Sequence, residues 1–168
     1  GPPEVAAVRL AVDEINAAGG VLNQPVELIP GDSGDTTTDT ANATVDRELA
    51  AGTQVIIGAA SSSVSLKVID KIASAGVVMF SPANTSDQFV CYADGGMYFR
   101  TAPTDSLQAQ ALAQLIAEDG AQRVSILALN DPYGTGLAEN TVTNLVDAGI
   151  PEDQIQKIIY DPNAQSFN

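Results

Sequence analysis

The stretch "QVIIGAASSSVSLKVIDKIASAG", Gln54 to Gly76, contains the pattern that decides the fold. Its first six residues form an apolar run without alternation, as expected of a strand that is buried on both faces of a parallel sheet. A helix is predicted directly afterwards, from Val64 to Ala75. A buried strand that leads straight into a helix is the repeating unit of α/β proteins, so this stretch predicts that fold class.

The same alternation continues on both sides of this stretch. Apolar residues at helical spacing predict a helix from Pro3 to Ala18, which Gly19 and Gly20 end. The other predicted strands are 26–30, 77–81, 97–101, 123–129 and 154–160, and the other predicted helices are 37–50, 106–118 and 136–148. Short turns join these elements, so we expect parallel sheets flanked by helices.

Three consecutive serines, Ser61 to Ser63, stand where the buried strand turns into the helix. Ligands of open α/β sheets bind beyond the carboxyl ends of strands, where the next helix offers N–H groups and the positive end of its dipole. In two other predicted helices, Asp39 and Gln108 stand at the third helical position, where a carboxyl or amide group completes a capping box. The serine helix has Val64 or Leu66 at that position. The serines therefore suit an anion such as a carboxylate. The alternative is ordinary capping by one serine, with the others solvated.

Two further loops follow predicted strands. "SPANTSDQF" places Asn84 and Thr85 after the next parallel strand, where we expect them beside the serines. "NDPYGTG" presents Tyr133, whose ring could cover an organic ligand. In the alternative interpretation, these residues are ordinary loop and turn formers.

The composition excludes several classes of function. A formal net charge of −14 disfavours nucleic acids and anionic lipids as partners. The chain has no histidine and a single cysteine, Cys91, which nearly excludes histidine-based catalysis, zinc sites and intrachain disulfides. The acidic loop "GDSGD" is explained by turn chemistry. No apolar run is long enough for a membrane span, so we expect a protein that is not transmembrane.

Five segments together resemble the periplasmic substrate-binding proteins of branched-chain amino-acid ABC importers. They are "AVRLAVDEINAAGGVLNQPVELIPGDSGD", "VIIGAASSSVS", "SPANTSDQF", "MYFRTAPTDSLQAQALAQLI" and "ALNDPYGTGL". The resemblance implies a periplasmic binding protein type 1-like fold with two α/β lobes. Residues 1–102 would form lobe I without its first strand and C-terminal return, and residues 103–168 would form part of lobe II. We therefore expect a fragment of a longer chain.

The resemblance also implies roles for particular residues. The family's carboxylate-binding serine falls at Ser62, with Ser61 and Ser63 as neighbours. Its second ligand loop falls at Asn84 and Thr85, and its aromatic wall falls at Tyr133. These residues would bind an amino acid or a related small carboxylate.

The implied function is that of a solute receptor, not an enzyme, which delivers its ligand to an ABC transporter permease. This function implies no cofactor and no metal. The implied location is periplasmic or extracellular, with lipid anchoring to the membrane as an option in the full-length protein. Two alternatives stay open: a ligand-sensing domain of a regulator or receptor with the same fold, and a Rossmann-like enzyme whose serine loop binds phosphate.

Overall fold

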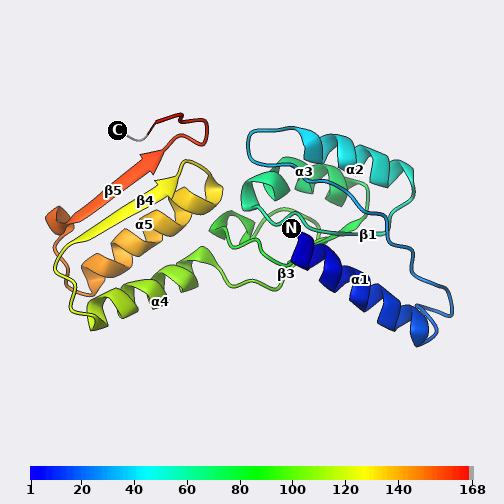
Figure 1. Cartoon of the computed structure of the whole chain (residues 1–168), viewed down its shortest axis with the longest axis horizontal. Coiled ribbons are helices and arrows are strands. Elements are labelled where there is room, and N and C mark those ends of the chain that lie inside the picture. Colours follow the sequence, from blue (N-terminus) through cyan, green and yellow to red (C-terminus); the bar gives the residue numbers. More distant parts are fainter. Residues whose placement is uncertain (167–168) are drawn as a thin grey trace. The chain divides into compact units, whose positions relative to one another are not determined.

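The computed structural model describes residues 1–166, which form two compact parts that divide after Asp32. The first part contains helix α1, Pro2–Ala17, drawn in dark blue in Figure 1. Gly20 has a positive φ of 76° and donates its N–H to the carbonyl of Ile15 at 2.9 Å, which closes the helix as the sequence predicted.

The predicted strand 26–30 is wrong, because that segment forms no strand in the structure. The side chain of Asn16 holds both backbone groups of Val26, with Nδ2 donating to its carbonyl at 2.9 Å and Oδ1 accepting from its N–H at 2.7 Å. A side chain thus bonds the backbone groups that would otherwise join a neighbouring strand.

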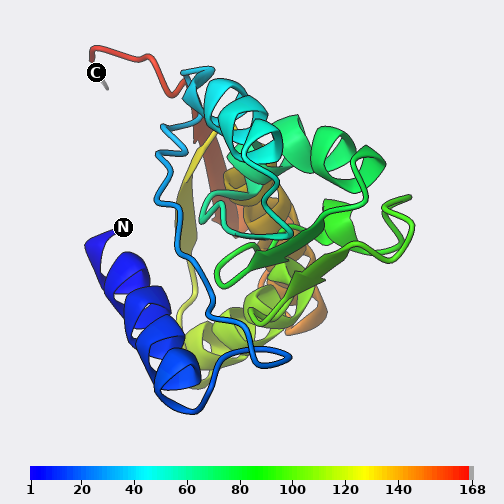
Figure 2. The same cartoon turned by 90° about the vertical axis from the view of Figure 1, so that its right-hand side faces the viewer.

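The second part begins with a parallel sheet of three strands. These are β1 (Val55–Ile57), β2 (Val78–Ser81) and β3 (Tyr98–Arg100), in the order β1-β2-β3. Helices α2 (Thr40–Ala50) and α3 (Ser62–Ser74) lie side by side in Figures 1 and 2. Val45 of α2, Ile69 and Ile72 of α3 and Met79 of β2 belong to one buried hydrophobic cluster. This packing places the carboxyl ends of β1 and β2 next to each other.

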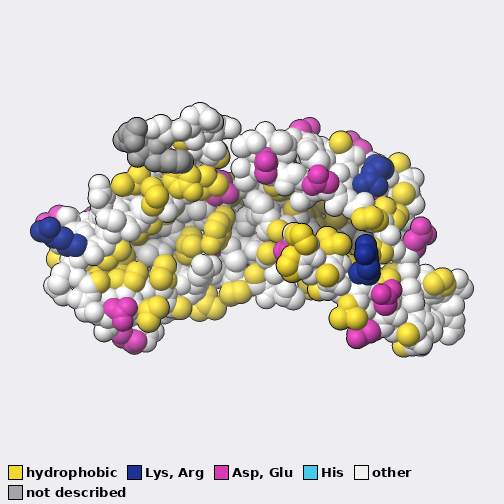
Figure 3. Space-filling model, viewed as in Figure 1, with side chains coloured by type: hydrophobic (Ala, Val, Ile, Leu, Met, Phe, Trp, Pro, Cys, Tyr) yellow, Lys and Arg dark blue, Asp and Glu magenta, His cyan; other side chains and the backbone are white. Residues whose placement is uncertain are grey.

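A second parallel sheet follows along the chain, with strands β4 (Val124–Leu129) and β5 (Ile155–Tyr160). Helices α4 (Asp105–Glu118) and α5 (Pro132–Asp147) pack together, and their core includes Ala113 and Leu145. Leu127 and Ile158 remain 65% and 43% exposed, and Figure 3 shows hydrophobic side chains on the surface over these strands. Two short 3-10 helices, η1 (Asp87–Phe89) and η2 (Glu152–Gln154), complete the elements.

Both sheets are parallel and flanked by helices, which confirms the predicted fold class. The boundary between residues 102 and 103 stays a prediction. Within residues 1–166, no helix is both long and apolar enough to cross a membrane.

Every α-helix starts one to four residues away from its predicted start, and for α2, α4 and α5 nearby side chains explain the difference. Helix α2 begins at Thr40 and not at residue 37, since the Asp35 carboxylate bonds the N–H groups of Thr37 and Thr38 at 2.8 and 3.0 Å and forms a separate turn. These bonds, that of the Thr37 hydroxyl first, lower the pKa of Asp35. Asp39 stands at the N-cap position, but its carboxylate bonds the Asn42 side chain and no backbone group of the helix.

Helices α4 and α5, in contrast, start earlier than predicted, at Asp105 and Pro132. Thr104, and not Asp105, caps α4 by accepting the N–H of Leu107 at 3.3 Å. Asp131 caps α5 by accepting the N–H of Gly134 at 2.7 Å, and Pro132 occupies the first helical turn. The segment that the sequence presents as a loop around Tyr133 is therefore the start of a helix.

Candidate functional site

The N-terminus of α3 is formed by the three serines. Ser61 is the N-cap residue and its hydroxyl accepts the N–H of Val64 at 3.5 Å. The first intrahelical bond runs from the N–H of Ser65 to the carbonyl of Ser61, so the N–H groups of Ser62 and Ser63 have no partner within the helix. Ser62 and Ser63 are buried, with 3% and 8% of their surface exposed. The helix therefore carries a buried set of donors at its positive end.

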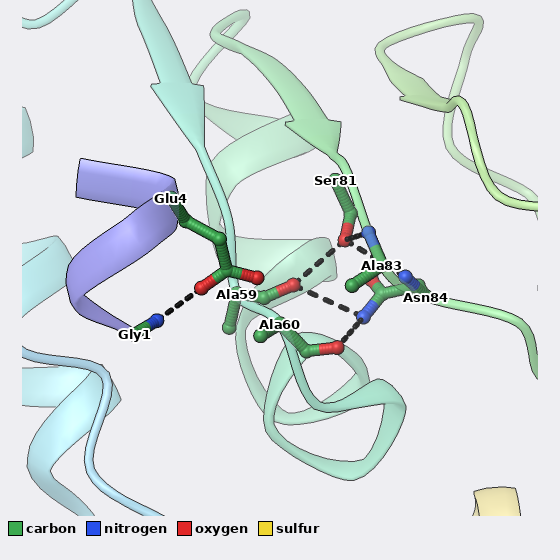
Figure 4. Close-up of polar contacts among 7 residues, drawn as sticks. All are labelled: Gly1, Glu4, Ala59, Ala60, Ser81, Ala83 and Asn84. Atoms are coloured by element: carbon green, nitrogen blue, oxygen red, sulfur yellow. Dashed lines mark hydrogen bonds and ion pairs between the residues drawn. The ribbon is translucent and has the colours of Figure 1, made fainter. Parts of the chain in front are cut away.

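Asn84 joins the loop after β2 to the loop after β1, as Figure 4 shows. Its Nδ2 donates to the carbonyls of Ala59 and Ala60 at 3.0 and 2.9 Å, and its Oδ1 accepts from the Tyr98 hydroxyl at 3.0 Å. The Ala59 carbonyl also accepts from the Ser81 hydroxyl at 2.7 Å. The Asn84 side chain is fully buried and engaged within the protein, so it shapes the site, and its direct contact with a ligand stays a prediction.

Ser62 and Thr85 are brought together by the backbone of the second loop. The Ser62 hydroxyl accepts the N–H groups of Thr85 and Ser86, both at 3.3 Å, and can still donate its own proton. Arg100 fixes the same loop by donating to the carbonyl of Ser86 at 2.8 Å. Two loops from neighbouring strand ends thus meet at the start of α3, as the sequence led us to expect.

The start of α5 reaches the same place. The Ser63 hydroxyl donates to Oδ2 of Asp131 at 2.7 Å, and the Ser86 hydroxyl donates to the carbonyl of Pro132 at 3.5 Å. Tyr133 follows directly in the first turn of α5 and is 40% exposed. All three sequence segments singled out for ligand binding therefore contribute to one cluster. The roles of Ser61, Ser62, Ser63, Thr85 and Tyr133 as ligand contacts stay predictions.

Asp105, in the first turn of α4, is a site residue that the sequence did not single out. It is fully buried, and its N–H donates to the carbonyl of Thr85 at 2.8 Å. Within the described part of the chain, neither oxygen of its carboxyl group has a hydrogen-bond partner, and the buried Thr85 hydroxyl has none either. An acid in the first turn of a helix is common, so nothing in the local pattern distinguishes Asp105 as a site residue.

Burial raises the pKa of Asp105, because the charged form loses its solvation. The nearby Thr85 hydroxyl lowers this pKa by less, although the two groups do not form a hydrogen bond of ordinary geometry. The negative charges of Asp87 and Asp131 raise the pKa further, while Arg100 opposes them. The surroundings of Asp105 would therefore be stabilised by a positively charged group.

The other charged groups near the serines are already engaged. The Lys67 ammonium, one turn into α3, donates to the carbonyls of Thr36 and Thr38 at 2.9 and 3.0 Å. Across residues 1–166, no three side chains of His, Cys, Asp or Glu are grouped so that they could hold a metal ion.

A sequence model of the family described as "Periplasmic binding protein" matches residues 1–168. The chain belongs to this family. Periplasmic binding proteins bind solutes and are not enzymes, as the sequence analysis expected.

Among curated relatives, the chain is 31% identical to the "Leu/Ile/Val-binding protein BraC3" of Rhizobium johnstonii over 146 residues. It is also 31% identical to the "Leu/Ile/Val-binding protein homolog 2" of Brucella abortus over 153 residues. Each match covers 86% of this chain but 39% of the relative, so the chain spans about two fifths of their length.

Solved periplasmic binding proteins share the fold. One is an ABC transporter substrate-binding protein of Desulfitobacterium hafniense in complex with Leu, which is 31% identical in sequence to this chain. The two structures superimpose with a TM-score of 0.69, and the match covers 94% of this chain and 45% of that one. A periplasmic binding protein type 1 of Bordetella pertussis has a TM-score of 0.80 at 24% identity, with 96% of this chain and 44% of that one covered. The likeness confirms the type 1 fold expected from the sequence.

Proposed function

We propose that this protein is a solute-binding receptor of an ABC importer and that it binds an amino acid or a related small carboxylate. The names of the relatives from Rhizobium and Brucella, and the Leu complex of the Desulfitobacterium protein, support this ligand class. Delivery to a membrane permease and a periplasmic or extracellular location are parts of the same proposal.

The ligand's carboxylate is assigned to the N-terminus of α3. The hydroxyl of Ser62 and the N–H groups of Ser62 and Ser63 are donors at the positive end of a helix dipole, which favours an anion. A phosphate ligand fits less well, because phosphate sites usually recruit a lysine or arginine. Lys67 is already bonded to two carbonyls, and the nearby acids Asp105 and Asp131 would repel a doubly charged group.

The ligand's ammonium is assigned to Asp105 and the Thr85 hydroxyl, and this assignment carries the proposal. Asp87 and Asp131 both accept hydrogen bonds from the protein. Asp105 is fully buried, and among residues 1–166 neither of its carboxyl oxygens has a hydrogen-bond partner. A buried carboxylate in this condition is strongly destabilising unless a cation or donor joins it. An ammonium group supplies both a positive charge and three donors.

The two assigned positions are linked through one residue. The N–H of Thr85 donates to the Ser62 hydroxyl, while the carbonyl of Thr85 accepts from the N–H of Asp105. The acceptor for an ammonium and the donors for a carboxylate are therefore held on either side of Thr85. One amino acid carries both of the charged groups that these two positions would bind.

An NMR titration of the ¹⁵N-labelled protein with three compounds tests the assignment. Leucine carries both charged groups, 4-methylpentanoate lacks the ammonium, and 3-methylbutylamine lacks the carboxylate. We expect Ser62→Ala to weaken the binding of leucine and the carboxylate, and Asp105→Asn to weaken the binding of leucine and the amine. Each loss should be about tenfold, the equivalent of one charge-assisted hydrogen bond.

Exposed residues at the ends of helices α3 and α5 provide controls with the same change of side chain. Ser74→Ala at the end of α3 and Asp147→Asn at the end of α5 should leave all three affinities unchanged. Leucine binding that stays within twofold of the wild type in Asp105→Asn would contradict the assignment of the ammonium. Binding of nucleotides in place of amino acids would contradict the proposed function as a whole.

A further inference from the structure

The loop after β2 is bonded through every backbone polar group of three consecutive residues. On the N–H side, Asn84 donates to the Ser81 hydroxyl at 3.1 Å. The N–H groups of Thr85 and Ser86 both donate to the Ser62 hydroxyl at 3.3 Å. These three bonds attach one side of the loop to the end of β2 and to the start of α3.

Arg100, at the end of β3, bonds the carbonyl side of the same loop. Its Nη1 donates to the carbonyl of Ser86 at 2.8 Å and to that of Asn84 at 3.4 Å. The carbonyl between them, that of Thr85, accepts the N–H of Asp105 at 2.8 Å. One guanidinium thus bonds the residues on either side of Thr85. Arg100 therefore fixes the backbone from which Thr85 presents its hydroxyl, which has no hydrogen-bond partner among residues 1–166.

Two stacked aromatic rings hold the guanidinium in this position. The Cζ atom of Arg100 lies 5.7 Å from the centroid of the Phe89 ring, and a cation over an aromatic face is stabilised by the ring. Phe89 in turn stacks on Tyr98 with the ring centroids 4.6 Å apart, and the Tyr98 hydroxyl donates to Oδ1 of Asn84 at 3.0 Å. These contacts form a closed ring that starts and ends at the loop. Across residues 1–166, Arg100 forms no ion pair with a carboxylate.

The charge of Arg100 acts on the buried acid of the site. Burial is the main cause that raises the pKa of Asp105, and the negative charges of Asp87 in η1 and Asp131 before α5 raise it further. The Thr85 hydroxyl and the positive charge of Arg100 lower it. Loss of this charge therefore favours the neutral form of Asp105, which attracts an ammonium group far less than the carboxylate does.

We propose that Arg100 is a positioning residue of the candidate site, which fixes the loop that carries Thr85 and supports the negative charge of Asp105. The proposal rests on the proposed function, because the ammonium of the ligand is assigned to these two residues. Arg100 acts through them and not by contact with the ligand. If Arg100 served only to fill space, an uncharged side chain with a similar apolar stem would replace it without effect on either group.

Two variants separate the charge and donors of Arg100 from the space that it fills. Arg100→Met keeps an apolar stem, whereas Arg100→Lys keeps the charge and can donate to the same carbonyls. Arg123→Met is the control, because it removes the same charge at an exposed position where the guanidinium bonds Gln154. Arg123 and Asp131 stand at opposite ends of β4, a strand about 20 Å long.

NMR on the ligand-free protein gives two readouts. In a ¹³C titration of the Asp105 carboxyl group, we expect the midpoint to lie at higher pH in Arg100→Met than in the wild type. Amide hydrogen exchange at Thr85 and Ser86 should be about tenfold faster in Arg100→Met, the equivalent of one lost hydrogen bond. Arg100→Lys and Arg123→Met should match the wild type in both readouts. Arg100→Gln, which keeps a donor without the charge, should raise the Asp105 midpoint as well and serves if Arg100→Met does not fold.

The pH dependence of ligand binding gives a third readout. The affinity for 3-methylbutylamine should be lost at higher pH in Arg100→Met than in the wild type, and Arg100→Lys should restore the wild-type profile. The affinity for 4-methylpentanoate, which lacks the ammonium, should have the same pH dependence in all variants.

The ligand-free readouts decide the proposal separately from the proposed function. An Asp105 midpoint and amide exchange in Arg100→Met that match those of Arg123→Met would overturn the role of Arg100. If both change as expected but the wild type binds neither leucine nor the amine, the proposed function fails and the effect of Arg100 on Thr85 and Asp105 stands.

Discussion

Replacement of Asn84 by alanine should destabilise the protein and loosen both loops of the candidate site. The buried Asn84 side chain makes three hydrogen bonds, to the carbonyls of Ala59 and Ala60 and to the Tyr98 hydroxyl. In Asn84→Ala, the Ala59 carbonyl keeps its bond to Ser81, but the Ala60 carbonyl and the Tyr98 hydroxyl lose these partners. An unsatisfied buried polar group costs about 1–3 kcal/mol, so we expect a loss of about 3 kcal/mol.

Asn84→Asp separates hydrogen bonding from side-chain size. One oxygen of the new side chain can accept from Tyr98, but the other would face the carbonyl oxygens of Ala59 and Ala60. The charged form is therefore disfavoured and the pKa of the new aspartate in the folded protein should rise above its unfolded value of about 4. Because the folded state then binds the proton more tightly, stability should fall as pH rises through this window, by about 1.4 kcal/mol per pH unit.

Urea unfolding at pH 5 and pH 7 measures both effects. Tyr98→Phe removes only one of the bonds and should cost about 1 kcal/mol. Gln88→Ala, at an exposed position, should stay within about 0.5 kcal/mol of the wild type. The reasoning is refuted if Asn84→Ala costs no more than Gln88→Ala, or if Asn84→Asp has the same pH dependence as the wild type.

Three further substitutions test the fold and the buried acid. Ile69→Ala should lower the free energy of unfolding in urea by about 3 kcal/mol, because Ile69 is fully buried. Leu127→Ala, at a position that is 65% exposed, should lower it far less. Equal losses would contradict the described core. Thr104→Ala should cost about 1 kcal/mol through loss of the α4 cap and Thr104→Ser should restore it, as measured by the same unfolding curves. Burial raises the pKa of Asp105, so the stability of the wild type should fall as pH rises above about 4. Asp105→Asn should remove this loss. If the melting temperatures of the wild type and the variant change in parallel between about pH 4 and 7, the prediction is contradicted.

The strands were predictable where the chain supplies a neighbour for them. The apolar runs that contain β1, β2, β4 and β5 are all strands in the structure, since each pairs with another parallel strand. The run 26–30 looked similar but pairs with no strand among the described residues, and the side chain of Asn16 bonds both backbone groups of Val26. Residue patterns describe how well a segment suits a sheet, whereas pairing depends on what lies beside it.

The helix starts were less predictable because several side chains compete for the same N–H groups. Thr104 and Asp105 are adjacent, and both could cap α4, but Thr104 forms the cap and Asp105 becomes buried inside the first turn. The meeting of Ser62 with Thr85 followed from the rule that parallel strands end at the same edge. The burial of Asp105 depends on packing between distant segments, which no local pattern records.

The carbonyl of Ala59 has one more consequence, for how this protein can vary over evolution. It accepts from the hydroxyls of Ser65 and Ser81 as well as from Asn84, which makes three donors for one oxygen. Such redundancy lets a lineage exchange either serine alone while the oxygen stays paired. Position 65 is the easier of the two to exchange, because the Ser81 hydroxyl also accepts the N–H groups of Ala83 and Asn84. Loss of both serines would leave Asn84 as the one side chain of the three that still bonds this oxygen.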